Sequence, residues 1–293
     1  MSVSHLLTLI LLLCWLLMPV SAFACDSKDS ILIYIRDDVY EDYTRVTANR
    51  PVTEINDFSV KGMRRDVVDM IIAQQALAEG GFDKSFCYAA GKVNFRNTRL
   101  LQQGKLLMSF DSYWYKDALE IEDSVYISSP VIRNGEYVAA IYTRPDNQAV
   151  LSIQTASDLA SLSAVSTPLW QTDWKTFQTL GLKELVREDD WVSQVQMVYR
   201  GWVDFMLMPY LPEQNPYVLE HLSLQPVKDT AVILWGSRHF VISRKHPDGE
   251  KAYKAIEKGL NVLRSQQRIK RAYTQAGFFK ASEKVNILNP VEN

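Results

Sequence analysis

Residues 63–110 read MRRDVVDMIIAQQALAEGGFDKSFCYAAGKVNFRNTRLLQQGKLLMSF and contain the pattern that indicates the fold. Apolar residues recur at helical spacing over residues 63–79, where one face carries Val67, Met70, Ile71 and Leu77. Gly80 and Gly81 then mark a helix end. A strand is expected to follow at 85–89, then a second helix at 94–103 and another strand at 106–110. Strands that alternate with helices of this length indicate βαβ units around a parallel sheet, so we predict an α/β fold.

The flanking segments extend this scheme in both directions. Residues 31–35 (ILIYI) predict a first strand, which a polar, turn-like stretch over 37–58 follows. The second half repeats the alternation. A short helix is expected from Ser157. Strands are then expected at 163–166, 182–186 and 203–208, with helices between them at 170–180 and 189–200. Two extended passages, at 125–143 and 229–243, bracket this half. A long helix at 249–277 closes the chain. This order indicates a chain that crosses from one lobe to a second and returns.

The N-terminus predicts export. Residues 6–18 (LLTLILLLCWLLM) form an apolar run of 13 residues, which is too short to span a bilayer and suits a secretory signal peptide. Ala22, Phe23 and Ala24 form a small-x-small cleavage site. We therefore expect a signal peptide over residues 1–24, with cleavage after Ala24. The segment before the apolar run lacks the Lys or Arg that usually begins such a signal.

The composition excludes several classes of function. The chain has 32 basic and 34 acidic residues and a net charge of −2, without basic clusters, which argues against nucleic acid as a partner. Its four histidines do not have the spacing of metal ligands. No phosphate-binding loop or nucleophile elbow occurs. We therefore expect no metal, no cofactor and no enzymatic activity.

Two cysteines remain after removal of the signal peptide, Cys25 and Cys87. In an oxidising compartment, a disulfide between them is the simplest expectation. It would close a loop of about 63 residues and stabilise the fold by about 4 kcal/mol. The alternatives are two unpaired thiols or a lipid attached to Cys25.

The order of these segments resembles the bacterial extracellular solute-binding proteins of family 3. The matching pieces extend over nearly all of the mature chain, at residues 60–62, 66–71, 100–107, 126–130, 153–159, 196–207 and 240–277. The resemblance implies the type II periplasmic-binding-protein fold, in which two crossing strands join two lobes and a ligand is clamped between the lobes. Lobe 1 would comprise residues 25–136 and 232–293, and lobe 2 residues 137–231. It also implies that the protein works in the periplasm.

The candidate ligand-binding residues follow from this geometry. In open α/β sheets, ligands bind beyond the carboxyl ends of strands and beside helix N-termini. The residues expected there are Tyr34, Arg36, Asp111, Ser112, Trp114, Ser129, Trp170, Thr172 and Tyr210. Each has a structural alternative: the two tryptophans could be core aromatics, Asp111 a helix cap, and Arg36 one half of a surface ion pair.

Two groups with which the family holds a free α-amino acid are absent from their expected places. No arginine lies between Arg99 and Arg133, ahead of residues 127–130, and no acid stands beside Tyr210. The aromatic residues around the candidate positions suit a flatter or less charged solute.

We therefore predict a monomeric periplasmic solute-binding protein that clamps a small polar or aromatic solute and delivers it to a membrane transporter, with an inner-membrane permease as partner. The alternative is a stand-alone periplasmic sensor that presents its ligand-closed form to a signalling receptor. A dehydratase, an activity found among the family's relatives, is less favoured because the sequence singles out no acid or base.

Overall fold

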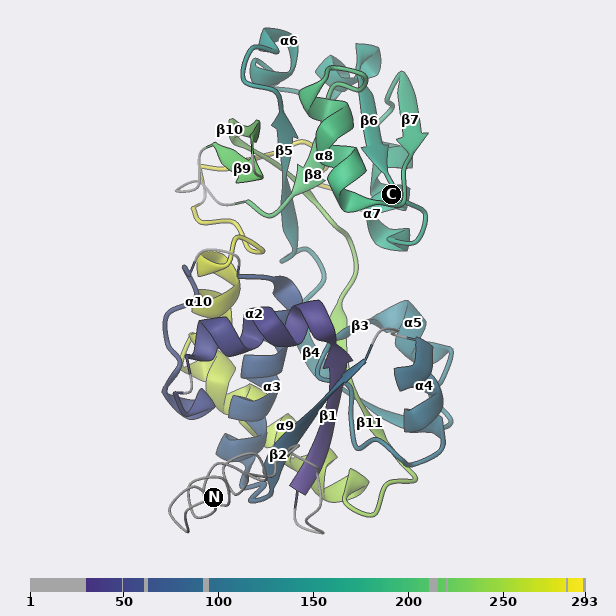
Figure 1. Ribbon diagram of the computed structural model, residues 1–293, viewed down its shortest axis with the longest axis vertical. Coiled ribbons are helices and arrows are strands. Elements are labelled where there is room, and N and C mark those ends of the chain that lie inside the picture. Colours follow the sequence, from purple (N-terminus) through teal and green to yellow (C-terminus); the bar gives the residue numbers. More distant parts are fainter. Residues whose placement is uncertain are drawn as a thin grey trace, which may run out of the picture.

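The chain forms two α/β lobes stacked along its long axis (Figure 1), and this confirms the predicted fold class. The computed structural model describes residues 30–48, 50–60, 63–91, 95–210, 216–219, 221–282 and 284–291. The predicted signal peptide and Cys25 lie outside these residues, so cleavage and the disulfide stay predictions. No helix in the described part of the chain combines the length and the apolar character that a membrane span requires.

Lobe 1 is built on strands from both ends of the chain. β1 (Ser30–Arg36) pairs in parallel with β2 (Ser85–Gly91), and β11 (Arg238–Ser243) lies antiparallel between β3 (Tyr113–Trp114) and β4 (Val125–Ile132). The helical segments of this lobe are α2 (Asp37–Thr47), η1 (Val52–Glu54), α3 (Arg65–Gly80), α4 (Phe95–Gln102), α5 (Tyr115–Leu119), α9 (Gly249–Ser265) and α10 (Arg268–Gln275).

The core of lobe 1 is the contact between α3 and α9. Every residue of α3 from Val67 to Leu77 is buried. The two helices touch backbone to backbone because glycines stand at the contact: a Cβ atom on Gly259 would lie 1.8 Å from the carbonyl oxygen of Ala76. No residue larger than glycine fits at Gly259 without separating the helices.

Lobe 2 has a mixed sheet with the strand order β12-β10-β5-β8, and β9 pairs with the outer part of β10. The parallel pair β6-β7 joins it through a bridge between Ala164 and Phe205. Its strands are β5 (Val138–Thr143), β6 (Ser163–Ser166), β7 (Glu184–Arg187), β8 (Met206–Met208), β9 (Tyr217–Leu219), β10 (Leu222–Ile233) and β12 (Asn286–Ile287). Its helical segments are α6 (Gln148–Leu151), η2 (Ala156–Ser161), α7 (Gln171–Thr179) and α8 (Trp191–Tyr199).

The structure differs from the predicted elements in three places. The stretch expected to be turn-like begins with α2, whose buried Val39, Tyr43 and Val46 recur at helical spacing. Residues 106–110 are not a regular strand but meet β11 through one bridge, between Met108 and Ile242. The C-terminal helix is two helices, because Gln267 adopts a left-handed conformation with φ of 58°.

The C-terminal residues lie in the second lobe, whereas the predicted boundary assigned residues 232–293 to lobe 1. β12 pairs in parallel with β10, and Val285 and Leu288 are buried in the two apolar clusters of lobe 2. The chain therefore passes between the lobes a third time after α10. The predicted boundary between residues 136 and 137 lies between β4 and β5, whereas the one between 231 and 232 cuts β10, whose Val232 and Ile233 still pair with β5 of lobe 2.

Candidate functional site

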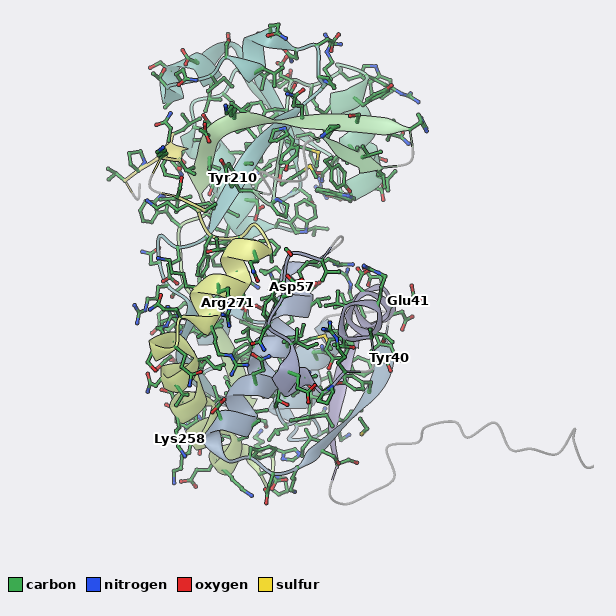
Figure 2. All side chains as sticks on the ribbon, turned by 90° about the vertical axis from the view of Figure 1, so that its left-hand side faces the viewer. Tyr40, Glu41, Asp57, Tyr210, Lys258 and Arg271 are labelled. Atoms are coloured by element: carbon green, nitrogen blue, oxygen red, sulfur yellow. The ribbon has the colours of Figure 1, made fainter. Side chains whose placement is uncertain are left out.

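The segments that link the lobes are tied to one another by backbone hydrogen bonds. The amide of Leu234 donates to the carbonyl of Tyr137 at 2.9 Å, which joins the two crossings predicted from the sequence. Val138 and Tyr210 donate to carbonyls of the third passage, at Phe278 (2.9 Å) and Gly277 (2.6 Å). Figure 2 shows Tyr210 at the level where the two lobes meet, above α10. The three passages thus form one hydrogen-bonded hinge.

A group of charged side chains lies in lobe 1 at the start of α3. Asp69 is fully buried and accepts hydrogen bonds from the amide (2.9 Å) and hydroxyl (2.6 Å) of Ser112, from the Tyr273 hydroxyl and from Arg65. Four donors around one buried carboxylate satisfy its capacity to accept hydrogen bonds. Asp69 therefore fixes the segment that carries Ser112 against α3.

Asp111 and Arg238 complete this group. Asp111 lies 2.8 Å from Arg65 and 3.7 Å from Arg238, and although burial opposes its ionisation, these two arginines hold the pKa of Asp111 below its usual value. Arg238 donates to the hydroxyl of Ser112 at 2.9 Å and also to its carbonyl oxygen. Burial, together with the nearby positive charge of Arg65, lowers the pKa of Arg238.

An aromatic ring lies against Arg238, and a second ring lies beside the first. The guanidinium carbon of Arg238 lies 4.6 Å from the ring centroid of Trp114, a cation–π contact. The Trp114 ring in turn lies 5.7 Å from the ring of Tyr137, at the first crossing. Burial raises the pKa of Tyr137 to about 12, with Arg65 and Arg238 acting in the opposite direction.

Lobe 2 contributes Asp173 from the first turn of α7. Burial raises the pKa of Asp173 from 3.8 to about 6, against the opposing effects of its own backbone N–H and of Arg238 and Arg65. Because Arg238 and Arg65 of lobe 1 lower this pKa, we group Asp173 with the charged residues of lobe 1. We name this set the interlobe cluster, with the members Arg65, Asp69, Asp111, Ser112, Trp114, Tyr137, Asp173 and Arg238.

Two exposed lysines, one from each lobe, lie at the edge of this region. Lys116 on α5 and Lys175 on α7 are both exposed, and the proximity of Lys116 lowers the pKa of Lys175. Like charges held close together repel, and solvent weakens this repulsion. In Figure 1, α5 of lobe 1 lies below α7 of lobe 2 on the same side of the molecule.

The structure places three of the candidate ligand-binding residues, Asp111, Ser112 and Trp114, in the interlobe cluster. Two more lie beside Asp173 at the start of α7: Trp170, which is 39% exposed, and Thr172. All five stay predictions as ligand contacts.

The other four candidates lie elsewhere. Arg36 pairs with Asp38 at 2.5 Å, and Tyr34 packs with its ring on the apolar cluster beside α4 and α5. Ser129 turns to α9, where its amide and hydroxyl both donate to Glu257 at 2.6 Å. Tyr210 is buried among lobe 2 residues at the hinge.

The sequence reasoning missed five members of the interlobe cluster: Arg65, Asp69, Tyr137, Asp173 and Arg238. One signal was present. Asp69 interrupts an otherwise apolar helical run, and an acid in a buried helix requires a hydrogen-bonded or charged partner. Nothing comparable distinguishes Asp173 from other polar residues near a helix start.

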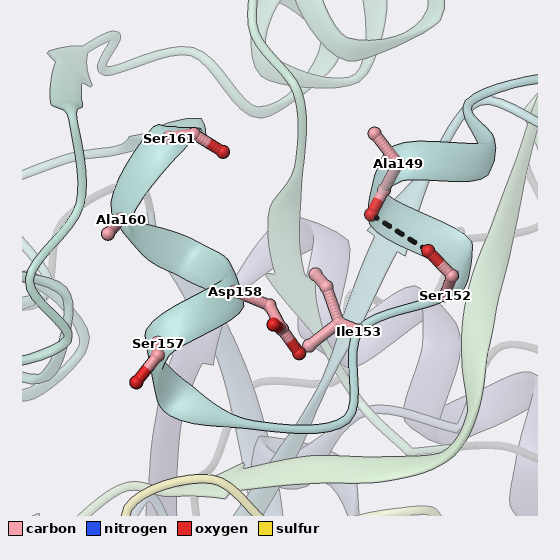
Figure 3. A pocket seen from close by; sticks show the side chains of 7 residues that line it. All are labelled: Ala149, Ser152, Ile153, Ser157, Asp158, Ala160 and Ser161. Atoms are coloured by element: carbon pink, nitrogen blue, oxygen red, sulfur yellow. Dashed lines mark hydrogen bonds between the residues drawn. The ribbon is translucent and has the colours of Figure 1, made fainter.

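Two surface hollows lie away from the interlobe cluster. Figure 3 shows the first, of about 460 Å³, between α6 and η2 of lobe 2, where Ser152, Ser157 and Asp158 are among the lining residues. The second, of about 550 Å³, lies beside Tyr126 and Arg244 in lobe 1. Asp158 is already used, since its carboxylate accepts from the amides of Gln154 and Thr155 at 2.9 and 2.8 Å. Neither hollow contains a predicted ligand-binding residue.

No model of a known protein family matches the chain, and no curated protein matches it in sequence. Its fold is nevertheless similar to solved structures. An ancestral cationic amino acid solute-binding protein is 17% identical, with 86% of this chain and 96% of that chain covered and a TM-score of 0.52. A double mutant of the BvgS VFT2 domain from Bordetella pertussis is 15% identical (85% and 94% covered, TM-score 0.52). Substrate-binding domain 2 of Lactococcus lactis GlnP, in its open conformation, is 13% identical (88% and 99% covered, TM-score 0.51).

These similarities show that the chain has the two-lobed type II periplasmic-binding-protein fold. At such low identities they establish the fold and leave the function to be argued from the site.

Proposed function

We propose that the protein is a periplasmic solute-binding protein whose two lobes close over a small polar or aromatic solute and deliver it to a membrane transporter. The interlobe cluster is the observation that carries the proposal. Its ion pairs lie in lobe 1, and its rings of Trp114 and Tyr137 pack against an apolar cluster of lobe 2. A solute held there would contact both lobes and favour one relative position of the lobes.

The hinge supports this proposal. Backbone hydrogen bonds tie its three passages together, while the lobes keep separate apolar cores. Two rigid bodies joined by short linking segments are suited to hinge closure around a ligand. The neighbours by fold include proteins named for solute or substrate binding. We propose the same class of function here, without catalysis.

Native mass spectrometry of protein purified from the periplasm without refolding tests the proposal. We expect a species heavier than the mature chain by the mass of a small solute, which is released when the protein is denatured. A mature chain starting at Cys25 is read from the same spectrum. Protein that carries no solute, and whose stability no small polar or aromatic solute raises in a thermal-shift screen, would contradict solute binding.

Deletion of the gene distinguishes transport from signalling. If the protein delivers its solute to a transporter, the deletion reduces uptake of that solute, and expression of the intact chain restores it. Unchanged uptake together with an altered transcriptional response to the solute would contradict the transport role and favour the sensor alternative.

A further inference from the structure

Lobe 2 exposes apolar side chains at one edge of its parallel strand pair. β6 and β7 run in parallel, and α7 and α8 follow their carboxyl ends. Four apolar residues lie between these strand ends and the first turns of the helices: Leu169, Trp170, Trp191 and Val192. Leu169, Trp170 and Val192 are 71%, 39% and 44% exposed. We name these four residues the apolar edge.

Hydrogen bonds and ring contacts fix the two halves of the apolar edge to each other. The hydroxyl oxygen of the buried Thr167 accepts from the amide of Leu169 at 3.2 Å, and the hydroxyl donates to Asp189 at 2.5 Å. The ring of Trp191 packs on an apolar cluster of lobe 2 and lies 6.1 Å from the ring of Trp170, at an angle of 56°. The two tryptophans, which come from different loops, therefore stand as one pair.

The acidic groups beside the apolar edge are already paired. Asp189 lies 2.8 Å from Arg187 in an ion pair and also accepts from Thr167. The carboxylate of Asp190 accepts from the amide of Ser193 at 2.8 Å, which caps the start of α8. Both acids are therefore engaged in holding the loops, and the apolar side chains are what this edge offers to a ligand.

The position of the apolar edge favours a solute as the molecule that covers it. In open α/β sheets, ligands bind beyond the carboxyl ends of the strands. Figure 1 shows α5 of lobe 1 below α7, and α5 exposes two more apolar residues, Tyr115 (47%) and Leu119 (39%). Exposed apolar residues that gather in one region mark an interaction site. A solute between the lobes would meet apolar side chains from both of them.

Building on the proposed function, we propose that the apolar edge makes the protein specific for solutes with an aromatic ring, which lies against the pair of Trp170 and Trp191. Contact between aromatic rings contributes binding energy beyond the burial of their area. Trp191 and Leu169 are then specificity residues in addition to the candidate Trp170. The solute class narrows from small polar or aromatic solutes to aromatic ones.

Four matched pairs of compounds test this inference by titration calorimetry: phenylalanine and alanine, phenethylamine and ethylamine, phenylpropionate and propionate, phenylacetamide and acetamide. Within each pair a phenyl group replaces one hydrogen, and the four pairs differ in charge. We expect the aromatic member of at least one pair to bind at least tenfold more tightly than its partner. Trp191→Ala should weaken that binding at least tenfold and Leu169→Ser at least threefold, with the other member of the pair unaffected.

Trp202→Ala is the matched control. Trp202 is a 64% exposed tryptophan of lobe 2 that follows the other end of α8, so its loss should leave aromatic binding unchanged. Circular dichroism checks the folded state of Trp191→Ala. Leu169→Ser changes a side chain that is 71% exposed, so it tests the apolar edge even where Trp191→Ala does not fold.

Three results would overturn the inference. The first is that no aromatic compound binds at least tenfold more tightly than its partner, and the second is aromatic binding that both edge variants leave unchanged. The third is equal weakening of both members of a pair, which would mean that the apolar edge acts on lobe closure alone. None of these contradicts solute binding itself, because that proposal depends on the solute found by mass spectrometry. A bound solute without an aromatic ring would likewise overturn only the inference.

Discussion

At the scale of single residues, Trp114 links the charged groups to the hinge. One side of its ring meets Arg238, and the ring also lies near Tyr137 and 3.3 Å or less from where a Cβ atom on Gly236 would stand. These contacts support its expected role as a packed aromatic, while its role as a ligand contact stays a prediction. A substitution at this residue is expected to affect stability as well as binding.

We expect Trp114→Ala to lower the free energy of unfolding by about 2 kcal/mol, because it removes the cation–π contact and half-buried apolar surface. Urea denaturation measures the change. Trp202→Ala is the matched control: its ring lies 5.0 Å from the guanidinium carbon of Arg200, but Trp202 is 64% exposed. The control should lose less than about 1 kcal/mol. Equal losses would contradict the structural role of Trp114.

The raised pKa of Asp173 predicts that the stability of the folded protein depends on pH. Its pKa in the folded protein, about 6, is above 3.8, so between these pH values the folded state holds more protons at this group than the unfolded state. The contribution of Asp173 to the free energy of unfolding should therefore fall as pH rises from about 4 to about 6. The difference in unfolding free energy between the wild type and Asp173→Asn measures this contribution. A difference that stays constant from pH 4 to pH 6.5 would show that the carboxyl group is not perturbed.

At the scale of helices and strands, α3 was predicted well because it is buried all round and ends in glycine. α2 was missed because its four acidic residues and its turn-like neighbours obscured the spacing of its buried face. The break between α9 and α10 was missed for a different reason: Gln267 adopts a positive φ that its residue type does not signal.

The contact between α3 and α9 makes Gly259 a sensitive position. We expect Gly259→Ala to destabilise lobe 1 by about 3 kcal/mol or more, since the added methyl group would overlap the Ala76 carbonyl unless the helices separate. Thermal unfolding measures the effect. Lys258→Ala, at the neighbouring exposed position that Figure 2 shows on the outer side of α9, should change stability little. Equal behaviour of the two variants would contradict the close helix contact.

The C-terminal passage holds the second crossing through Asn289. Its side-chain oxygen accepts from the amide of Ile233 at 2.7 Å, and its side-chain nitrogen donates to the Ile233 carbonyl at 2.9 Å. Asn289→Ala leaves both backbone groups without this partner, so the Ile233 amide should exchange its hydrogen faster, with a local loss of about 2 kcal/mol. Asn286→Ala, in the same passage, removes an exposed hydrogen bond to Gln154 and serves as the control. Unchanged exchange at Ile233 would show that Asn289 does not hold the crossing.

At the scale of the whole molecule, the order of segments was enough to predict two lobes, but it could not predict which side chains meet between them. Arg65 and Arg238 are 173 positions apart, and they share Asp111 only because β11 lies beside β3. Ser129 shows the same limit on one strand. The pairing of β4 with β11 changes register near His239, and Ser129 faces α9 while Ser128 bonds to β11. Such details depend on the packed structure and not on local sequence.

The central claim is that the lobes close over a solute at the interlobe cluster, and small-angle X-ray scattering tests it most directly. We expect the radius of gyration of the solute-free protein to fall when the solute identified by mass spectrometry is added, because closure brings the lobes together. Trp191→Ala should show a smaller fall at the same solute concentration. A wild-type radius of gyration that stays unchanged at saturating solute would contradict the claim.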